Sequence, residues 1–353
     1  MSTLPLLSIA KPTEGLLFIG DPHLWSLKPG RRRDTSYKDT VLRKIALAAE
    51  VSNRLNLWPI LLGDLFHQPD DNDTQMLVQV IRALDLFERR PVSLEGNHDK
   101  NQLKLADNNP LRLLEVAGKL DIISQGPWAQ MVLENGQGRA HTVVIGGTPF
   151  GQSLPVSYKD AFGEDRTEEV NTAIWLTHED LAFDGSYPDA LPLLPIKQVE
   201  LVVNGHMHGT KLPVKVEDTV YYNPGNITRM SVDMADHVPA VWEWNPFTDE
   251  TMISSAGQKV PLLRQHVLAH TPGTEIFDFE GRHTKKAAIT VEAQSSFVSQ
   301  LLEQPADMRT DDGTYARAAL SEVLDESNSS DAVRTIAAHL CEESLRRHRE
   351  EKA

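Results

Sequence analysis

Six short apolar segments, each ending in a glycine or a polar residue, place the strongest constraint on how this chain can fold. They lie at 16–20, 59–63, 91–96, 141–147, 172–178 and 199–205. In the first part of the chain these segments alternate with stretches of helical periodicity, one of which has Thr74 as its expected N-cap. Continuous apolar strands that alternate with amphipathic helices are typical of α/β folds, in which helices cover the sheets. We therefore expect an α/β domain whose ligands bind beyond the carboxyl ends of its strands.

The pattern changes after about residue 215, where shorter strands and turns replace the alternation. The last fifty residues carry apolar stripes at helical spacing, such as the one formed by Val333, Ile336 and Leu340. We expect three parts: a catalytic domain at 1–255, a capping or accessory region at 256–304, and a C-terminal helical segment at 305–353.

Five of the expected strands end beside a side chain that can bind a metal ion. A single histidine after a strand is more often an ordinary hydrogen-bonded residue, so the prediction rests on the whole set. Carboxylates and imidazoles without a thiolate suit Mn²⁺, Fe or Zn²⁺. The candidate ligands are Asp21, His23, Asp64, Asn97, His178, His206 and His208.

This set is too large for one ion, which needs about four protein ligands. Two ions about 3.5–4 Å apart use the whole set if one carboxylate bridges them, and Asp64, alone after Gly63, is the natural bridge. In extended backbone His206 and His208 point the same way and can reach neighbouring ions. Gly205 and Gly209 are expected to let the backbone turn close to the metals.

These blocks resemble the pattern of the calcineurin-like metallophosphoesterase superfamily, D-x-H, G-D, G-N-H-D/E, H and G-H-x-H, over roughly residues 15 to 230. The resemblance implies a four-layered α/β/β/α sandwich of two mixed sheets. It assigns Asp21, His23, Asp64 and His208 to one ion, and Asp64, Asn97, His178 and His206 to the other. It also implies that His98 is the general acid and that Asp99 orients it. The expected cofactors are two divalent ions, Mn²⁺ in the first place, with Fe or Zn²⁺ as alternatives.

The stretch "ILLGDLFHQPDDND" (60–73) resembles the corresponding block of SbcD-type DNA double-strand-break repair nucleases. The protein Ser/Thr phosphatase branch is disfavoured, because its arginine after G-D and its glutamate after G-N-H are absent. His67 would then lie near the entering phosphodiester, although it could equally cap the next loop. Arg31, Arg32 and Arg33 could contact a DNA backbone, although a solvated loop is the more common explanation.

Composition bounds the partners of the chain. The net charge of −15 opposes binding to a polyanion, unless the acidic groups gather around cations. A single cysteine, Cys341, and an N-terminus without a signal-peptide pattern favour the cytoplasm, and no segment is long enough to span a membrane. The resemblance implies an SbcC-type coiled-coil ATPase partner that binds the C-terminal helices. The sequence leaves a homodimer open.

We therefore predict a dinuclear metal phosphodiesterase, most like a DNA exo/endonuclease of repair or recombination. One alternative is a phosphoesterase that acts on a small nucleotide or another phosphate ester. Another, from a different class, is a scaffold that keeps this fold without catalysis.

Overall fold

The computed structural model describes residues 12–101, 104–186 and 188–279. Its first sheet has six strands in the order β14-β11-β1-β2-β3-β4. The parallel part consists of β1 (Gly15–Ile19), β2 (Leu57–Leu61), β3 (Val92–Leu94) and β4 (Asp121–Ile123). β11 (Ala240–Trp244) pairs antiparallel with β1, and β14 (Arg264–Val267) pairs antiparallel with β11. The sheet is therefore mixed.

The second sheet also has six strands, in the order β5-β6-β7-β8-β10-β9. Its parallel part consists of β6 (Ala140–Thr148), β7 (Thr172–Thr177), β8 (Leu201–Asn204) and β10 (Thr219–Asn223). The antiparallel edges are β5 (Gly126–Glu134) and β9 (Lys211–Val216). A separate hairpin joins β12 (Thr251–Ile253) to β13 (Lys259–Pro261). Two mixed sheets confirm the expected fold class.

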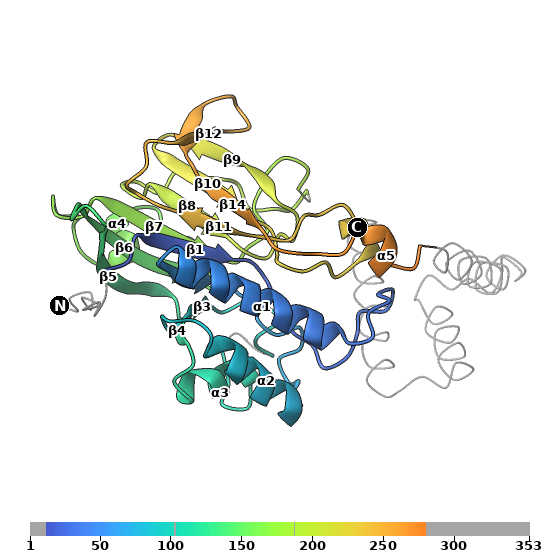
Figure 1. Cartoon of the computed structure of the whole chain (residues 1–353). Helices are drawn as coiled ribbons and strands as arrows, with labels where there is room; N and C mark the ends of the chain where they lie inside the picture. Colours follow the sequence, from blue (N-terminus) through green and yellow to red (C-terminus); the bar gives the residue numbers. More distant parts are fainter. Residues whose placement is uncertain (1–11, 102–103, 187, 280–353) are drawn as a thin grey trace, which may run out of the picture. The chain divides into compact units, whose positions relative to one another are not determined.

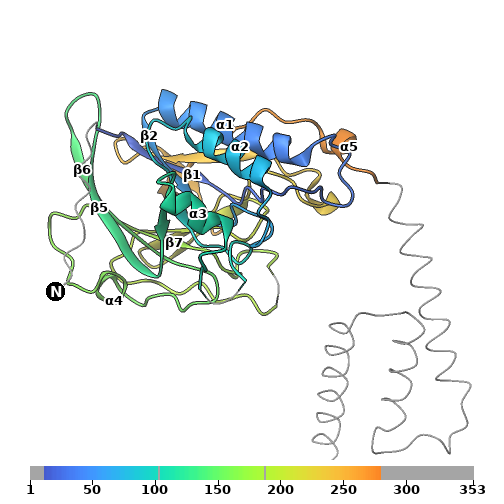
Figure 2. The same ribbon diagram turned by 90° about the horizontal axis from the view of Figure 1, so that it is seen from below.

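Helices cover the outer face of the first sheet (Figures 1 and 2). They are α1 (Tyr37–Arg54), α2 (Thr74–Leu84) and α3 (Pro110–Val116). α1 begins where the Ser36 side chain accepts a hydrogen bond from the Asp39 amide. The cap of α2 lies one residue earlier than expected, because Asp73 rather than Thr74 accepts from the Met76 amide.

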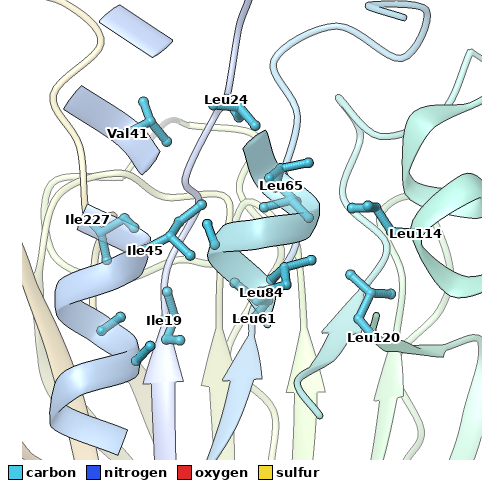
Figure 3. Close-up of a cluster of buried hydrophobic side chains, with 14 of the residues drawn as sticks. Ile19, Leu24, Val41, Ile45, Leu61, Leu65, Leu84, Leu114, Leu120 and Ile227 are labelled. Carbon is cyan, nitrogen blue, oxygen red and sulfur yellow. The ribbon is translucent and has the colours of Figure 1, made fainter. Parts of the chain in front are cut away.

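Alternation along β1 shows how the layers are held together. Leu17 and Ile19 pack against the helices in the core cluster drawn in Figure 3. Leu16 and Phe18 point to the other face and pack in the core between the two sheets. The outer face of the second sheet is covered by α4 (Tyr158–Phe162) and by loops, which share a third apolar cluster with it. The two sheets therefore stack face to face as the inner layers of the sandwich.

The chain from residue 256 to Phe279 belongs to the same compact unit as the two sheets. β13 and β14 follow that position, and β14 is an edge strand of the first sheet. The short elements η1 (Val232–Met234) and α5 (Gly273–Ile276) complete the unit, which ends at Phe279. The expected boundary at 255 thus falls inside it, and the expected boundary at 304 lies outside the described residues. Within the described ranges, no helix is long and apolar enough to cross a membrane.

Candidate metal centre

The ends of strands from both sheets meet at one place. From the first sheet, β1 leads to Asp21 and His23, β2 leads to Asp64, and β3 leads to Asn97. From the second sheet, β7 leads to His178, and β8 leads to His206 and His208. His23 Nε2 lies 2.8 Å from His208 Nε2. His178 Nε2 lies 3.2 Å from Asp64 Oδ2. The facing sheets therefore deliver one ligand cluster, as expected for sites at the carboxyl ends of α/β strands.

The cluster divides into groups that could each hold a cation. Asp21, His23 and His208 form one group, whose ligand atoms all lie within 4.8 Å of one another. A second group with the same spacing consists of Asp64, His178 and His206. Asp64 Oδ2 is also 3.7 Å from His23 Nε2, so this carboxylate connects the two groups. The arrangement fits two ions that share Asp64.

Four of the candidate ligands have a backbone in the left-handed region. The φ angles are +24° at Asp21, +49° at His23, +48° at Asp64 and +64° at His206. Such conformations are uncommon outside glycine, cost about 1–3 kcal/mol each, and gather at functional sites. The expectation of extended backbone at His206 is therefore wrong: the chain turns there, which sends His206 and His208 into different groups.

Glycines leave room for the cluster. A Cβ atom on Gly96 would lie 2.0 Å from Asp64 Oδ1, and one on Gly205 would lie 2.4 Å from the Leu62 carbonyl oxygen. Any side chain at either position would force the loops apart. Gly209 is different, because a Cβ atom there would meet nothing within 4 Å. The expected requirement for glycine is thus confirmed at Gly205 and wrong at Gly209.

Hydrogen bonds with the backbone and between side chains orient the ligands. His178 Nδ1 donates to the Leu62 carbonyl at 2.7 Å, which leaves Nε2 aimed at Asp64. His206 Nδ1 lies 3.0 Å from Asn97 Oδ1, so the predicted ligand Asn97 joins the cluster through its amide. The His98 amide donates to Asp64 Oδ1 at 2.8 Å. Fixed ring orientations of this kind raise the basicity of a ligand and select its tautomer.

The His98 ring lies beside the cluster, with its centroid 4.9 Å from that of His23. Its Nδ1 donates to the His67 carbonyl at 2.8 Å. Asp99 does not orient this ring as the resemblance implied. Its two oxygens instead accept from the backbone N–H groups of Phe66, at 3.1 Å, and Gly96, at 3.0 Å. Asp99 thus ties together the loops after β2 and β3.

Burial and charge set unusual protonation states. Burial raises the pKa of Asp21 to about 7, with a further contribution from Asp64. Burial would also raise the pKa of Asp64, but His178, His23 and His98 together hold it well below its usual range. Burial opposes a charge on His178, yet Asp64 and Asp21 raise its pKa to about 10. Without metal, the positive charge of His178 therefore neutralises the carboxylates.

The remaining imidazoles are held neutral. Burial lowers the pKa of His208 to about 4 and that of His23 well below its usual value. Neutral imidazoles have a free lone pair, which metal binding requires. Among the described residues, three buried atoms of the cluster form no regular hydrogen bond: Asp21 Oδ1, and the facing pair Asp64 Oδ2 and His178 Nε2, which lie 3.2 Å apart. Cations would satisfy all three, so the residues present fit a metal centre.

The predicted substrate contacts divide into two sets. His67 belongs to the cluster, since its ring stacks on His98 with centroids 5.0 Å apart and its Nδ1 lies 3.5 Å from His23 Nδ1. The arginines do not join the cluster. Arg32 is buried against Asp34, whereas Arg31 donates to the Asp278 carbonyl and Arg33 lies 3.5 Å from the Asp278 carboxylate.

Three residues near the cluster were not predicted from the sequence. Asp180 Oδ2 lies 3.3 Å from His206 Nε2, and its position two residues after His178 was the available signal. The Phe150 ring centroid lies 5.1 Å from that of His206. The Trp25 ring centroid lies 4.6 Å from that of His67. No local motif marks either aromatic residue, because the fold alone brings them to the cluster.

The glycine geometry predicts that Gly96→Ala loses bound metal while Gly209→Ala keeps it. The new methyl group at position 96 overlaps Asp64 Oδ1, whereas at position 209 it points into open space. Both proteins are purified with excess Mn²⁺, and metal content is measured by mass spectrometry. Full metal content in Gly96→Ala would show that the position of Asp64 does not matter.

The protonation states predict that Mn²⁺ stabilises the protein more at about pH 8.5 than at about pH 6. In the folded metal-free protein the pKa values of Asp21 and His178 are raised to about 7 and about 10. Below the pKa values of these groups in the unfolded chain, their protonation contributes its full stabilisation of the folded protein. That stabilisation is lost as the pH rises through the pKa values of the folded protein. Mn²⁺ competes with those protons, so its binding strengthens as they leave. Thermal unfolding with and without Mn²⁺ measures the difference, and an equal or smaller gain at the higher pH contradicts it.

Residues 16–210 match the family described as Metallophos, calcineurin-like phosphoesterase. No curated protein matches the sequence. Solved structures with some similarity include a 5′-nucleotidase precursor from Thermus thermophilus, at 17% identity and a TM-score of 0.40, where the match covers 82% of this chain and 59% of that one. The NAD nucleotidase of Haemophilus influenzae matches at 13% identity and a TM-score of 0.39, covering 80% and 56%. A novel archaeal phosphodiesterase matches at 14% identity and a TM-score of 0.32, covering 72% and 99%.

This chain thus spans less than two thirds of the length of the first two structures. At these TM-scores, none of the three supports a conclusion about substrate. The family match is of a different kind, because it covers more than half of the chain and ends just beyond His208. The chain belongs to the calcineurin-like phosphoesterase family.

Proposed function

We propose that this protein is a dinuclear metal phosphodiesterase that cleaves DNA, in the manner of an SbcD-type nuclease. The observation that carries the hydrolase part is the pair of ligand groups connected by Asp64. Asp21, His23, Asp64 and His208 would hold one ion, and Asp64, Asn97, His178 and His206 the other. Bound ions supply hydroxide near neutral pH and neutralise the oxygens of a phosphoester, and Mn²⁺ is the ion we favour among the metals that suit these ligands.

In this proposal His98 protonates the leaving group. Its Nδ1–H is engaged by the His67 carbonyl, so in the imidazolium form Nε2 carries the proton that can be given away. His67 stacks on this ring, and burial lowers the pKa of His67 to about 4, so His67 stays neutral and does not compete as an acid. The proton passes from His98 Nε2 to the departing alkoxide oxygen, and the ring then takes another from water.

DNA as the substrate rests on the block from Ile60 to Asp73 and on the place of His67. That block resembles the SbcD-type nucleases, and His67 lies at the cluster where a phosphodiester would enter. Trp25 lies against His67 and Phe150 lies against His206, and aromatic rings of this kind can stack on bases.

One observation favours a small phosphate ester instead. The net charge of −15 repels a long polyanion, whereas a single nucleotide would feel this field much less. A non-catalytic scaffold is disfavoured, because the strained backbone at Asp21, His23 and Asp64 is costly and is explained by metal binding.

Activity on defined substrates separates the two hydrolases. Linear duplex DNA, single strands and hairpins are compared with cyclic nucleotides, 5′-nucleotides and a chromogenic diester, all with Mn²⁺. We expect cleavage of DNA and of the chromogenic diester. Hydrolysis of nucleotides without any cleavage of DNA would replace the nuclease by the small-ester enzyme.

His98→Ala should lower turnover on the order of 10²–10⁴-fold while metal content stays near that of the wild type. The ring is a proton donor rather than a ligand in this proposal, so its loss leaves both ligand groups intact. Turnover and metal content are measured on the same preparation, with Lys159→Met on the exposed side of helix α4 as a control. Parallel loss of both metals would assign His98 to the ligand set.

We also propose that residues 305–353 bind an SbcC-type coiled-coil ATPase, and that the protein works in the cytoplasm. The support is the pair of apolar stripes in that segment and the single cysteine. The segment lies outside the described residues. Deletion of 305–353 should abolish binding to the ATPase but spare hydrolysis of a chromogenic diester. Binding that persists without the segment contradicts the docking role.

A further inference from the structure

A cavity of about 480 Å³ lies beside the N-terminal half of α1, apart from the ligand cluster. Besides the helix, residues 32–36, 228–229, 239, 269–271 and 275–276 line it. Its lining is rich in cations although the chain as a whole is acidic. The cationic side chains are those of Arg32, Arg33, Arg43, Lys44 and Arg229, and the carboxylates are those of Asp34, Asp39 and Glu275.

Three of these cations are buried around the cavity. Arg32, Lys44 and Arg229 are 5%, 6% and 4% exposed. Arg32 is neutralised by Asp34, which accepts from its Nε at 3.0 Å and from its Nη2 at 2.5 Å. Its guanidinium also lies over the Tyr37 ring at 5.0 Å. Asp34 also accepts from the Thr40 hydroxyl at 2.8 Å, so its carboxylate is engaged by Arg32 and Thr40, and the hydrogen bonds of the other two buried cations go to different groups.

Lys44 and Arg229 are held by backbone carbonyls. Lys44 Nζ donates to Ala269 at 2.6 Å. Arg229 donates from Nη1 to Ala235 at 2.9 Å and from Nη2 to Thr271. Within the described ranges, neither side chain forms an ion pair with a carboxylate. Carbonyl oxygens orient a cation but do not neutralise it, and Asp34, whose charge acts on Arg229, is already paired with Arg32. The positive charges of Lys44 and Arg229 are therefore only partly compensated in a buried setting, which is costly.

We propose that this cavity is a binding site for an anion that bears a terminal phosphate. A phosphate dianion carries two negative charges, which would neutralise the Lys44 ammonium and the Arg229 guanidinium. A guanidinium is also suited to hydrogen bonding with phosphate oxygens. Arg33 and Arg43 are exposed residues of the lining, and Arg33 lies beside the Asp278 carboxylate. Their positive charge can attract an anion. The volume exceeds that of one phosphate, so it accommodates either free phosphate or the phosphorylated 5′ end of a nucleic acid strand.

The lowered pKa of Lys44 is consistent with a binding site for an anion. Burial, with Arg229 and Arg32 as like charges nearby, lowers the pKa of Lys44 to about 8. An anion in the cavity would reverse that shift by stabilising the charged ammonium. None of the lining residues belongs to the ligand cluster, so binding of free phosphate is independent of the proposed nuclease activity, whereas binding of a nucleic acid end rests on it.

Phosphate-dependent stabilisation of the full-length, metal-loaded protein tests the proposal. Thermal unfolding is measured in inorganic phosphate and in chloride of equal ionic strength for the wild type, Lys44→Met, Lys44→Arg and Lys159→Met. Phosphate should raise the Tm of the wild type, of Lys44→Arg and of the exposed control Lys159→Met. In Lys44→Met the increase should be smaller, with only the part due to phosphate at the metals remaining. Its Tm in chloride should equal or exceed that of the wild type, because a buried charge without an ion-pair partner is gone.

Phosphate bound at the metals does not disturb the comparison, because Lys44→Met leaves every metal ligand in place. A duplex with phosphorothioate linkages, with and without a 5′-phosphate, distinguishes the sources. If only the Tm increase caused by the phosphorylated duplex depends on Lys44, the ligand is a nucleic acid end. If the Tm increase caused by inorganic phosphate depends on Lys44, the ligand is the free ion. An equal phosphate effect in the wild type and Lys44→Met overturns the proposal. So does a lower Tm of Lys44→Met in chloride with no phosphate effect in either protein, which would make Lys44 only a tie between α1 and Ala269.

Discussion

The rest of the site depends on one buried carboxylate, Asp64. It follows β2 at the centre of the first sheet and faces His178 from the second sheet. One of its oxygens accepts from the His98 amide, while the other has no hydrogen-bond partner among the described residues. A carboxylate without solvent is stable only beside positive charge. In the metal-free protein His178 supplies that charge, and with metals bound the cations take over the same role.

The sandwich explains how such a centre can be held in place. Leucines, isoleucines and valines from both sheets fill the space between them, and a second apolar cluster packs the helices on the first sheet. Burial of this apolar surface offsets the strained backbone at Asp21, His23, Asp64 and His206. The strained ligand residues lie in the loops that leave the strands rather than in the strands themselves. A rigid frame with strained loops is what precise placement of metal ligands requires.

The gathering of the candidate ligands was predictable because it depends on short-range patterns. An apolar strand followed by aspartate, histidine or asparagine marks each ligand loop, and the alternation of strands and helices indicates the edge where they meet. The place of β11 was not predictable in this way, because Ala240–Trp244 pairs with β1 across more than two hundred residues of chain. The contacts of Asp99 and Arg32 were also not predicted from the sequence. Asp99 binds backbone N–H groups rather than His98, and Arg32 is enclosed by Asp34 and aromatic rings, and both outcomes depend on tertiary packing.

A crystal structure of the protein grown with excess Mn²⁺, with the ions located by anomalous scattering, tests the central claim most directly. Two ions should appear about 3.5–4 Å apart, with Asp64 bound to both, His23 and His208 on one side, and His178 and His206 on the other. A single ion, or two ions that do not share Asp64, would contradict the dinuclear centre.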